Sequence, residues 1–338
     1  MNRNDPRYTQ FALTREMMDT VEVVRNFDPC GTAAIARHIS KLGRLMLTGE
    51  GSSRIFPAKN AIRKGLTWGL DLHVATEGSR QAATYDLSDF AIFAASNSGR
   101  TKEVVALLKK LQAAGHSARF GLTANANTVL ESHCLQTIVL SCGWEQAVAA
   151  TKSVAEQALV YQSLVSHIAG RDMEADMEGL ADKIEASLAA PIDPAIVRAV
   201  AKAGTIYFAG FNDGVAEELT LKTNEITRRK SDYLEGTYAV HGIEEVMAAG
   251  DVVFVVDPIA EEMEKFREVL VDGVGLTVVA IAACDTPFPT IRVPDAGPMN
   301  PYCFLAAGWN LLVEIGLAAG INLDKAQRAR KVGNEVAG

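Results

Sequence analysis

Two short turns rich in serine and glycine contain the residues whose types and spacing first indicate chemistry. Ser96, Ser98 and Thr101 follow an apolar stretch at 91–95, with Gly99 among them, and a helical pattern begins directly afterwards. The unpaired N–H groups at a helix start carry partial positive charge, and hydroxyl groups add donors, so such a turn binds an anion. The same residues are also typical of a plain helix cap without a ligand.

A second turn of this kind, at residues 49–54, follows the apolar stretch 44–48. Ligands of open α/β sheets bind at the carboxyl ends of strands, so two such turns at neighbouring strand ends predict one anion pocket. The guanidinium groups of Arg54 and Arg100 would add positive charge to this pocket. We therefore expect the ligand to contact Gly51, Ser52, Ser53, Arg54, Ser96, Asn97, Ser98, Arg100 and Thr101.

Acid–base chemistry is indicated further along the chain. Glu218, Lys222 and Glu225 recur at helical spacing and border an apolar line on the same expected helix. A carboxylate at the edge of a buried face suits a general base, although the ammonium group of Lys222 opposes a rise of its pKa. The alternative is a solvent-exposed face with a Glu–Lys pair. His241 precedes Gly242 in an expected loop, which favours a functional histidine.

The elements that must position these residues alternate between strands and helices, which predicts an α/β fold with doubly wound parallel sheets. In the first half, strands are expected at 44–48, 70–76, 91–95, 117–123 and 137–141, and helices at 55–68, 101–114 and 144–169. In the second half, strands are expected at 205–210, 251–257 and 277–284, and helices at 215–229, 260–272 and 301–320.

The two halves repeat one design with a period of about 150 residues, in a chain long enough for about two domains. The second half does not repeat the anion turn, because its counterpart at 252–262 contains Asp257, Glu261 and Glu262, which repel an anion. One anion pocket per chain is expected. The expected organisation is a helical arm at 1–43, a first domain at 44–170, a connector at 171–195 and a second domain with a tail at 196–338.

Composition excludes several classes of function. The net charge of −8 argues against a nucleic-acid partner, since phosphate backbones select basic surfaces. Five scattered cysteines without a CxxC pair indicate buried free thiols in a reducing cytoplasm, and neither a metal nor another cofactor is expected. The N-terminus does not resemble a signal peptide. The apolar stretch 304–321 contains Asn310 and Glu314, which predicts a buried helix rather than a membrane span.

Taken together, these residues resemble the family of proteins with two sugar isomerase (SIS) domains, which includes the isomerase half of glucosamine-6-phosphate synthase and the fructosamine-6-phosphate deglycases. The resemblance covers about residues 47–335. It is carried first by a Gly-Ser turn at 49–53 and by a loop at 96–101 that is similar to the family's phosphate loop S-x-S-G-x-T. A segment E-x-x-V-A-x-T-K follows at 145–152. The last part is a pair of motifs, E-x-x-x-K-x-x-E at 218–225 and His-Gly at 241–242.

The resemblance implies a fold of two tandem SIS domains and a set of roles. Glu225 would be the proton-transfer base, and His241 would open the sugar ring or assist as an acid, reaching across from a neighbouring subunit. The backbone of Val148 and Ala149 would contact the sugar. Lys331 would close over the open sugar, although the tail here lacks the usual Pro-Arg. A homodimer or larger assembly is therefore expected.

The resemblance also assigns Glu218 and Lys222 to the substrate pocket. One departure concerns the His-Gly-Pro sequence of the family, because Ile243 replaces the proline here and is followed by Glu244 and Glu245. This puts in question how the loop meets the substrate. A second departure is that no glutaminase domain is recognised and that the second position holds Asn2 instead of a cysteine, so glutamine-dependent amination is not expected.

Three functions agree with these residues. The first is aldose–ketose isomerisation of a sugar or amino-sugar 6-phosphate, by proton transfer between C1 and C2 through an enediol or enamine. The second is release of an amine, as in a fructosamine-6-phosphate deglycase or a glucosamine-6-phosphate deaminase. The third is binding of a sugar phosphate without catalysis. A sulfonate sugar in place of the phosphate also remains open.

Overall fold

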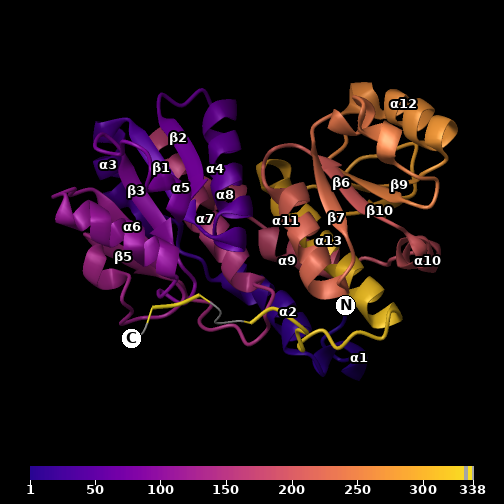
Figure 1. Cartoon of the computed structure of the whole chain (residues 1–338), viewed down its shortest axis with the longest axis horizontal. Coiled ribbons are helices and arrows are strands. Elements are labelled where there is room, and N and C mark those ends of the chain that lie inside the picture. Colours follow the sequence, from indigo (N-terminus) through magenta and orange to yellow (C-terminus); the bar gives the residue numbers. More distant parts are fainter. Residues whose placement is uncertain (331–333, 337–338) are drawn as a thin grey trace. The chain divides into compact units, whose positions relative to one another are not determined.

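Two five-stranded parallel sheets form the framework of the computed structural model, which describes residues 1–330 and 334–336 (Figure 1). The chain divides into two compact units, each built around one sheet. The first-sheet unit contains residues 22–145 and 150–178 and the described residues from 329 onward. The second-sheet unit contains residues 1–21, 146–149 and 179–328. The expected α/β class with two doubly wound parallel sheets is confirmed.

The first sheet has the strand order β2-β1-β3-β4-β5. Its strands are β1 (Arg44–Gly49), β2 (His73–Gly78), β3 (Ala91–Ala95), β4 (Arg119–Thr123) and β5 (Gln136–Val139). All five residues of β3 are buried, as expected for a central strand covered on both faces. The chain passes from β1 to β2 on one side and later to β3 on the other, so the winding direction reverses beside β1. Ligands of such folds bind at this reversal.

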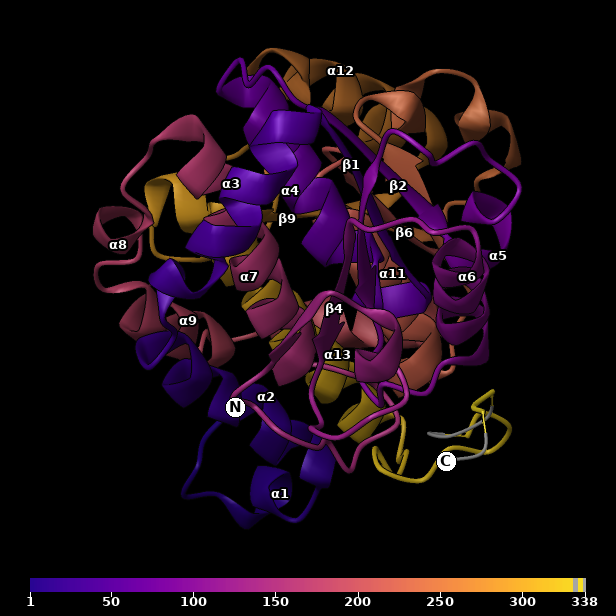
Figure 2. The same cartoon turned by 90° about the vertical axis from the view of Figure 1, so that its left-hand side faces the viewer.

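Helices cover both faces of the first sheet (Figure 2). One face carries α3 (Ala33–Leu42), α4 (Ile55–Thr67) and α7 (Lys152–Ala169), and the other carries α5 (Ser79–Ala82) and α6 (Lys102–Ala113). The short α8 (Met173–Asp176) follows α7. The ring of Phe93 on β3 packs against the ring of Tyr161 on α7, with centroids 5.1 Å apart, and against the ring of Phe120 on β4, with centroids 6.1 Å apart. This apolar layer holds the ends of β1 and β3 in place.

The second sheet has the order β10-β9-β8-β6-β7. Its strands are β6 (Ile206–Gly210), β7 (Ser231–Glu235), β8 (Val252–Val256), β9 (Thr277–Ala282) and β10 (Thr290–Arg292). The sequence predicts only β6, β8 and β9. The two missed strands lie at the edges and bury one side chain each, Leu234 and Ile291, so neither has an apolar run to reveal it.

The helices α1 (Pro6–Thr9), α2 (Ala12–Arg25), α9 (Leu180–Leu188), α10 (Pro194–Lys202), α11 (Val215–Lys222), α12 (Met263–Phe266) and α13 (Asn300–Ala318) complete the fold. One helical stretch, Gly297–Ala318, is long and apolar enough to cross a membrane, and 83% of its apolar window is buried inside the protein. Gly308 in α13 allows close contact with α11, because a methyl group there would lie 2.3 Å from Leu219.

The compact units differ from the expected domain boundaries. Residues 1–21 belong to the second-sheet unit rather than to a separate arm. Residues 179–195 belong to the same unit and not to a connector, because α9 packs along α13. The apolar side chains of α9, Leu180, Ile184 and Leu188, are buried there.

Candidate functional site

The two serine-rich turns follow neighbouring strands of the first sheet. Strands β1 and β3 are parallel, and Thr48 lies level with Ala94, so both turns leave the sheet at its carboxyl edge. A methyl group on Gly49 would lie 3.0 Å from the carbonyl oxygen of Ala95, so the strand ends approach closely where only glycine fits. The turns therefore occupy the position where the sheet reverses its winding direction, which is the usual ligand position.

The turn at 96–101 is ordered by its own side chains. The hydroxyl oxygens of Ser96 and Thr101 lie 2.8 Å apart, and the N–H of Thr101 donates to Ser96 Oγ at 3.2 Å. Gly99 has a left-handed φ of +66°, and a methyl group there would lie 2.3 Å from Thr128 Oγ1. Ser96 is buried and serves the turn itself, whereas the hydroxyl proton of Ser98 has no acceptor among the described residues.

The turn at 49–54 is a 3₁₀ turn closed by a hydrogen bond from the N–H of Arg54 to the carbonyl oxygen of Gly51 at 2.9 Å. Glu50 accepts the N–H of Ser79 at 2.8 Å and fixes the start of this turn. The guanidinium groups of Arg54 and Arg100 form no ion pair within the part of the chain that the structure describes. Both cations are available to an anionic ligand.

Residues 145–151 form a loop, which corrects the expected helix start at 144. The carboxylate of Glu145 is fully buried and accepts the N–H and the hydroxyl of Thr151 at 2.8 and 3.1 Å. It also accepts the hydroxyl of Ser153 and the side-chain N–H of Asn97. Because this carboxylate pairs with the donors at the start of α7, the helix begins at Lys152. The amide N–H of Asn97 is thereby directed toward Glu145.

The expected sugar contacts Val148 and Ala149 belong to the second-sheet unit. The residues before them are held by Glu16 on α2, whose buried carboxylate accepts the N–H groups of Gln146 and Ala147. Glu16 is not among the residues predicted from the sequence. Helix α2 contains three carboxylates, Glu16, Asp19 and Glu22, so its local pattern does not single out Glu16, which is the buried one.

Glu218, Lys222 and Glu225 form a buried charge cluster. Lys222 Nζ lies 3.3 Å from Glu218 Oε1 and 2.8 Å from Glu225 Oε2. Glu218 and Lys222 are fully buried, so the solvent-exposed alternative is wrong for them, while the Glu225 side chain stays 27% exposed. Helix α11 changes at Lys222 into a π-helical turn at Thr223–Thr227, a feature frequent at functional sites.

The charge state of Lys222 follows from its neighbours. Burial alone would lower the pKa of the ammonium group, but the carboxylates of Glu225 and Glu218 outweigh this effect and raise the pKa of Lys222. The ammonium group therefore remains charged at neutral pH. It holds the Glu225 carboxylate in a defined position with one face toward solvent, as a general base requires.

His241 lies in an exposed loop between short 3₁₀ turns at Tyr238–Val240 and Ile243–Val246. Glu244 accepts the N–H of Gly242 at 2.6 Å, which shapes the loop where the family has proline. Within the described residues, no hydrogen bond or ion pair joins the imidazole to Glu225 or to another side chain. Lys331, the other predicted catalytic residue, lies outside the described residues.

The described part of the tail contacts the chain directly after Gly99. Lys102 donates its N–H to the carbonyl oxygen of Asn334, and Val336 donates its N–H to that of Arg100, both at 3.0 Å. The tail therefore reaches the start of α6. No local sequence pattern predicts this pairing.

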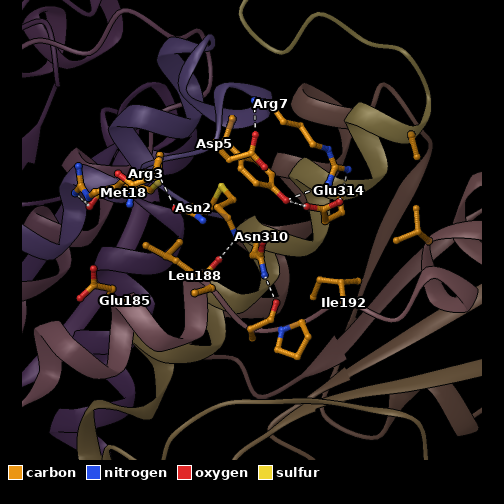
Figure 3. Close-up of a pocket in the computed structure, with 18 of the residues that line it drawn as sticks. Asn2, Arg3, Asp5, Arg7, Met18, Glu185, Leu188, Ile192, Asn310 and Glu314 are labelled. Carbon is orange, nitrogen blue, oxygen red and sulfur yellow. Dashed lines mark hydrogen bonds and ion pairs between the residues drawn. The ribbon is translucent and has the colours of Figure 1, made fainter.

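A cavity of about 1050 Å³ lies elsewhere, in the second-sheet unit between the N-terminal residues and α13 (Figure 3). Glu314 pairs there with Arg7 at 2.6 Å and accepts the Tyr8 hydroxyl at 2.5 Å. Burial and this hydrogen bond raise the pKa of Tyr8 to about 12. None of the predicted site residues that the structure describes lines this cavity. No group of three or more potential metal ligands occurs among the described residues.

Comparisons with known proteins agree with this architecture, although no family model matches the chain. Glutamine–fructose-6-phosphate aminotransferase [isomerizing] of Aeropyrum pernix is 24% identical over 318 residues, which cover 87% of this chain and 51% of that protein. The chain thus spans about half the length of this curated relative.

Solved structures show the same fold. The C-terminal domain of glucosamine-fructose-6-phosphate aminotransferase from Francisella tularensis has a TM-score of 0.77 at 16% identity, covering 94% of this chain and 98% of that one. Glucosamine-6-phosphate deaminase from Thermotoga maritima has a TM-score of 0.73 at 20% identity, covering 96% and 98%. The resemblance to proteins with tandem SIS domains is confirmed at the level of the fold.

Proposed function

We propose that this protein processes a sugar phosphate, and that the reaction is aldose–ketose isomerisation of a sugar or amino-sugar 6-phosphate. The observation that carries the proposal is the pair of hydroxyl-rich turns at the winding reversal of the first sheet. A terminal phosphate bound by Ser98, Thr101 and the 49–54 turn, with Arg54 and Arg100 beside it, would anchor the carbon chain. The name of the Aeropyrum pernix relative, which includes fructose 6-phosphate and isomerisation, supports this choice.

The proposed chemistry moves one proton from C2 to C1 and one from the C2 hydroxyl to the C1 oxygen, and it needs no oxidant. Glu225 removes the proton from C2 of the open-chain aldose, the electrons of that bond form the C1–C2 double bond, and the carbonyl oxygen at C1 takes a proton to give an enediol. Return of a proton from Glu225 to C1 and loss of the proton from the C2 hydroxyl give the ketose. Lys222 orients the base, and His241 donates a proton to the ring oxygen when the ring opens, while the anomeric hydroxyl loses its proton to form the C1 carbonyl.

Amine release is the second candidate. It is supported by the likeness to the Thermotoga maritima deaminase. The same carboxylate and histidine would act, and water would enter to release the amine from a glucosamine phosphate or fructosamine phosphate.

Incubation in deuterium oxide with fructose 6-phosphate, glucosamine 6-phosphate or fructoselysine 6-phosphate separates these reactions. Exchange of deuterium into C1 or C2 without free amine, followed by NMR, supports the isomerase. Stoichiometric amine supports the second candidate. Binding of all three sugars with neither exchange nor amine would show that the protein only binds sugar phosphates.

We also propose a cytoplasmic homodimer in which His241 acts on the neighbouring subunit. The imidazole of His241 lies on an exposed loop and has no hydrogen-bond partner among the described residues, which supports this arrangement. The free cysteines in the same described part of the chain suit a reducing compartment. Mixing inactive Glu225→Gln and His241→Ala subunits should then restore about a quarter of the wild-type activity, because half of the dimers are mixed and each has one complete site. No recovery after subunit exchange would place both residues in one chain.

A further inference from the structure

A single carboxylate links two distant segments of the first-sheet unit. Glu145 Oε2 accepts the side-chain N–H of Asn97, in the 96–101 turn, at 3.2 Å. The same carboxylate accepts the backbone N–H groups and the hydroxyls of Thr151 and Ser153 at the start of α7. Glu145 therefore connects the anion turn to the N-terminus of the longest helix of this unit.

The surroundings of Glu145 show that this link is specific. The side chain is fully buried, and its hydrogen-bond donors among the described residues are all neutral groups. A buried carboxylate is tolerated only when several donors compensate it. Because a carboxylate only accepts hydrogen bonds, Asn97 must direct Nδ2 toward it.

The orientation of Asn97 has a consequence for the turn. Asn97 Oδ1 lies buried without a hydrogen-bond partner among the described residues. Unsatisfied buried polar atoms are rare in native proteins and call for an explanation. The contact with Glu145 explains the unsatisfied oxygen of Asn97, because it holds the side-chain amide with Nδ2 toward the carboxylate and leaves Oδ1 without a partner.

We propose that Glu145 is a positioning residue for phosphate binding, which fixes the 96–101 turn before the ligand arrives. Donors that are already in place need no ordering when the anion binds. Without the Glu145–Asn97 hydrogen bond, the 96–101 turn would have to become ordered when phosphate binds, and this ordering would lower the affinity. The effect belongs to binding and not to the chemical step, because Glu145 is buried away from solvent. The inference rests on the proposed function only in taking phosphate as the anion.

Calorimetric titration of the full chain with inorganic phosphate tests this role. Glu145→Gln keeps the size of the side chain but replaces one acceptor oxygen by a donor, so phosphate affinity should fall by about tenfold. Glu156→Gln is the matched control. Glu156 is also buried and accepts the N–H groups of Ser141 and Cys142 at 2.7 and 2.8 Å, without contact to the anion turn. Its variant should lose thermal stability to a similar extent and keep wild-type phosphate affinity.

A double-mutant cycle keeps the test decisive if Glu145→Gln folds poorly. Asn97→Ala removes the other end of the link and should weaken phosphate binding similarly, and the double variant should be no weaker than either single one. Additive losses would overturn the link, as would equal affinity losses in the Glu145 and Glu156 variants.

The outcome is separable from that of the proposed function. If the wild type binds phosphate but converts no sugar phosphate, the proposed reaction fails, and the phosphate affinities still decide the role of Glu145. If a sugar phosphate is converted, Glu145→Gln should raise KM by about tenfold with kcat changed by less than about twofold. A wild type that binds no phosphate would overturn both proposals.

Discussion

Lys222 is an ammonium group buried between two carboxylates, and it determines how Glu225 can act. With Glu218 on its inner side and Glu225 on its outer side, the lysine stays charged. The buried pair fixes the cluster, and the partly exposed Glu225 is the member that a ligand can reach. Glu218, Lys222 and Glu225, which lie within about two helical turns, therefore make Glu225 a base that is both oriented and accessible.

Replacement of the proposed base should affect turnover far more than binding. Glu225→Gln keeps the size of the side chain but removes the proton acceptor, so kcat should fall by about 10²- to 10⁴-fold. Affinity for the sugar phosphate, measured by calorimetry, should stay within about tenfold. Glu261→Gln, at an exposed position of the second half, is the control and should retain full activity. Undiminished turnover in Glu225→Gln would exclude this residue as the base.

Loss of the buried cation should destabilise the protein. Lys222→Met leaves the buried carboxylate of Glu218 without its ammonium neighbour, which typically costs about 3–5 kcal/mol in the free energy of unfolding. Adding Glu218→Gln removes the uncompensated charge and should recover part of the loss. Urea unfolding followed by circular dichroism measures both values. A Lys222→Met protein as stable as the wild type would contradict the buried cluster.

The thiols should differ sharply in reactivity at pH 8. Burial raises the pKa of Cys134 and of Cys303 to about 11, and it also raises the pKa of Cys142. Only the thiolate reacts, so all three should stay protonated and resist a disulfide reagent at pH 8, and Cys134 and Cys303 should become reactive only as the pH approaches 11. Cys30 and Cys284 are exposed, which corrects the expectation of buried thiols for these two, and they should react rapidly. Peptide mapping identifies the labelled sites, and all five should react in urea. Rapid labelling of Cys303 in the native protein would contradict its burial.

At the level of secondary-structure elements, the anion turn depends on what packs against it. Thr128 lies directly over Gly99, and the N–H of Leu130 donates to the Gly99 carbonyl oxygen at 3.1 Å. Glu145 and the described tail contact other residues of the same stretch. The donor groups are therefore positioned by neighbouring elements and not by the turn sequence alone.

A methyl group at Gly99 should be poorly tolerated. Gly99→Ala combines a left-handed φ of +66° with a contact of 2.3 Å to Thr128, so it should lower stability and phosphate affinity together. Gly115→Ala is the control, because Gly115 has φ +76° with nothing within 4 Å of the added methyl group. The control should lose only about 1–2 kcal/mol from backbone strain. Equal stability of the two variants in urea would show that the Thr128 contact relaxes at little cost.

Across the chain as a whole, two sheets of the same design differ at their winding reversals. In the first sheet, hydroxyl and guanidinium groups follow β1 and β3. In the second, Asp257 follows β8, and Asp257 and Glu262 both line a small cavity at the carboxyl edge of the sheet. Negative charge at this position repels an anion.

The chain should therefore bind one phosphate. Titration of the wild type with inorganic phosphate should give a stoichiometry of one per chain, because Asp257 and Glu262 oppose anion binding at the second sheet. The double variant Ser98→Ala/Thr101→Ala should lose most of the binding heat. Two equivalents per chain would require a second anion site in the second-sheet unit.

Local sequence pattern was sufficient to predict a defined part of the fold and of the candidate site. The alternation of strands and helices, the position of β3 at 91–95, the start of α4 and both serine-rich turns follow from residues within a few positions of one another. The charged residues of α11 were also identified locally, including their place beside the apolar face.

Features that depend on distant residues became visible only in the folded chain. The edge strands β7 and β10 exist because neighbouring strands supply their hydrogen bonds, and their own side chains are largely polar or exposed. The start of α7 at Lys152 depends on Glu145, which also holds Asn97. Full burial of Lys222 likewise depends on packing that spacing along one helix cannot specify, because the periodicity shows which side faces inward but not how deeply it is covered.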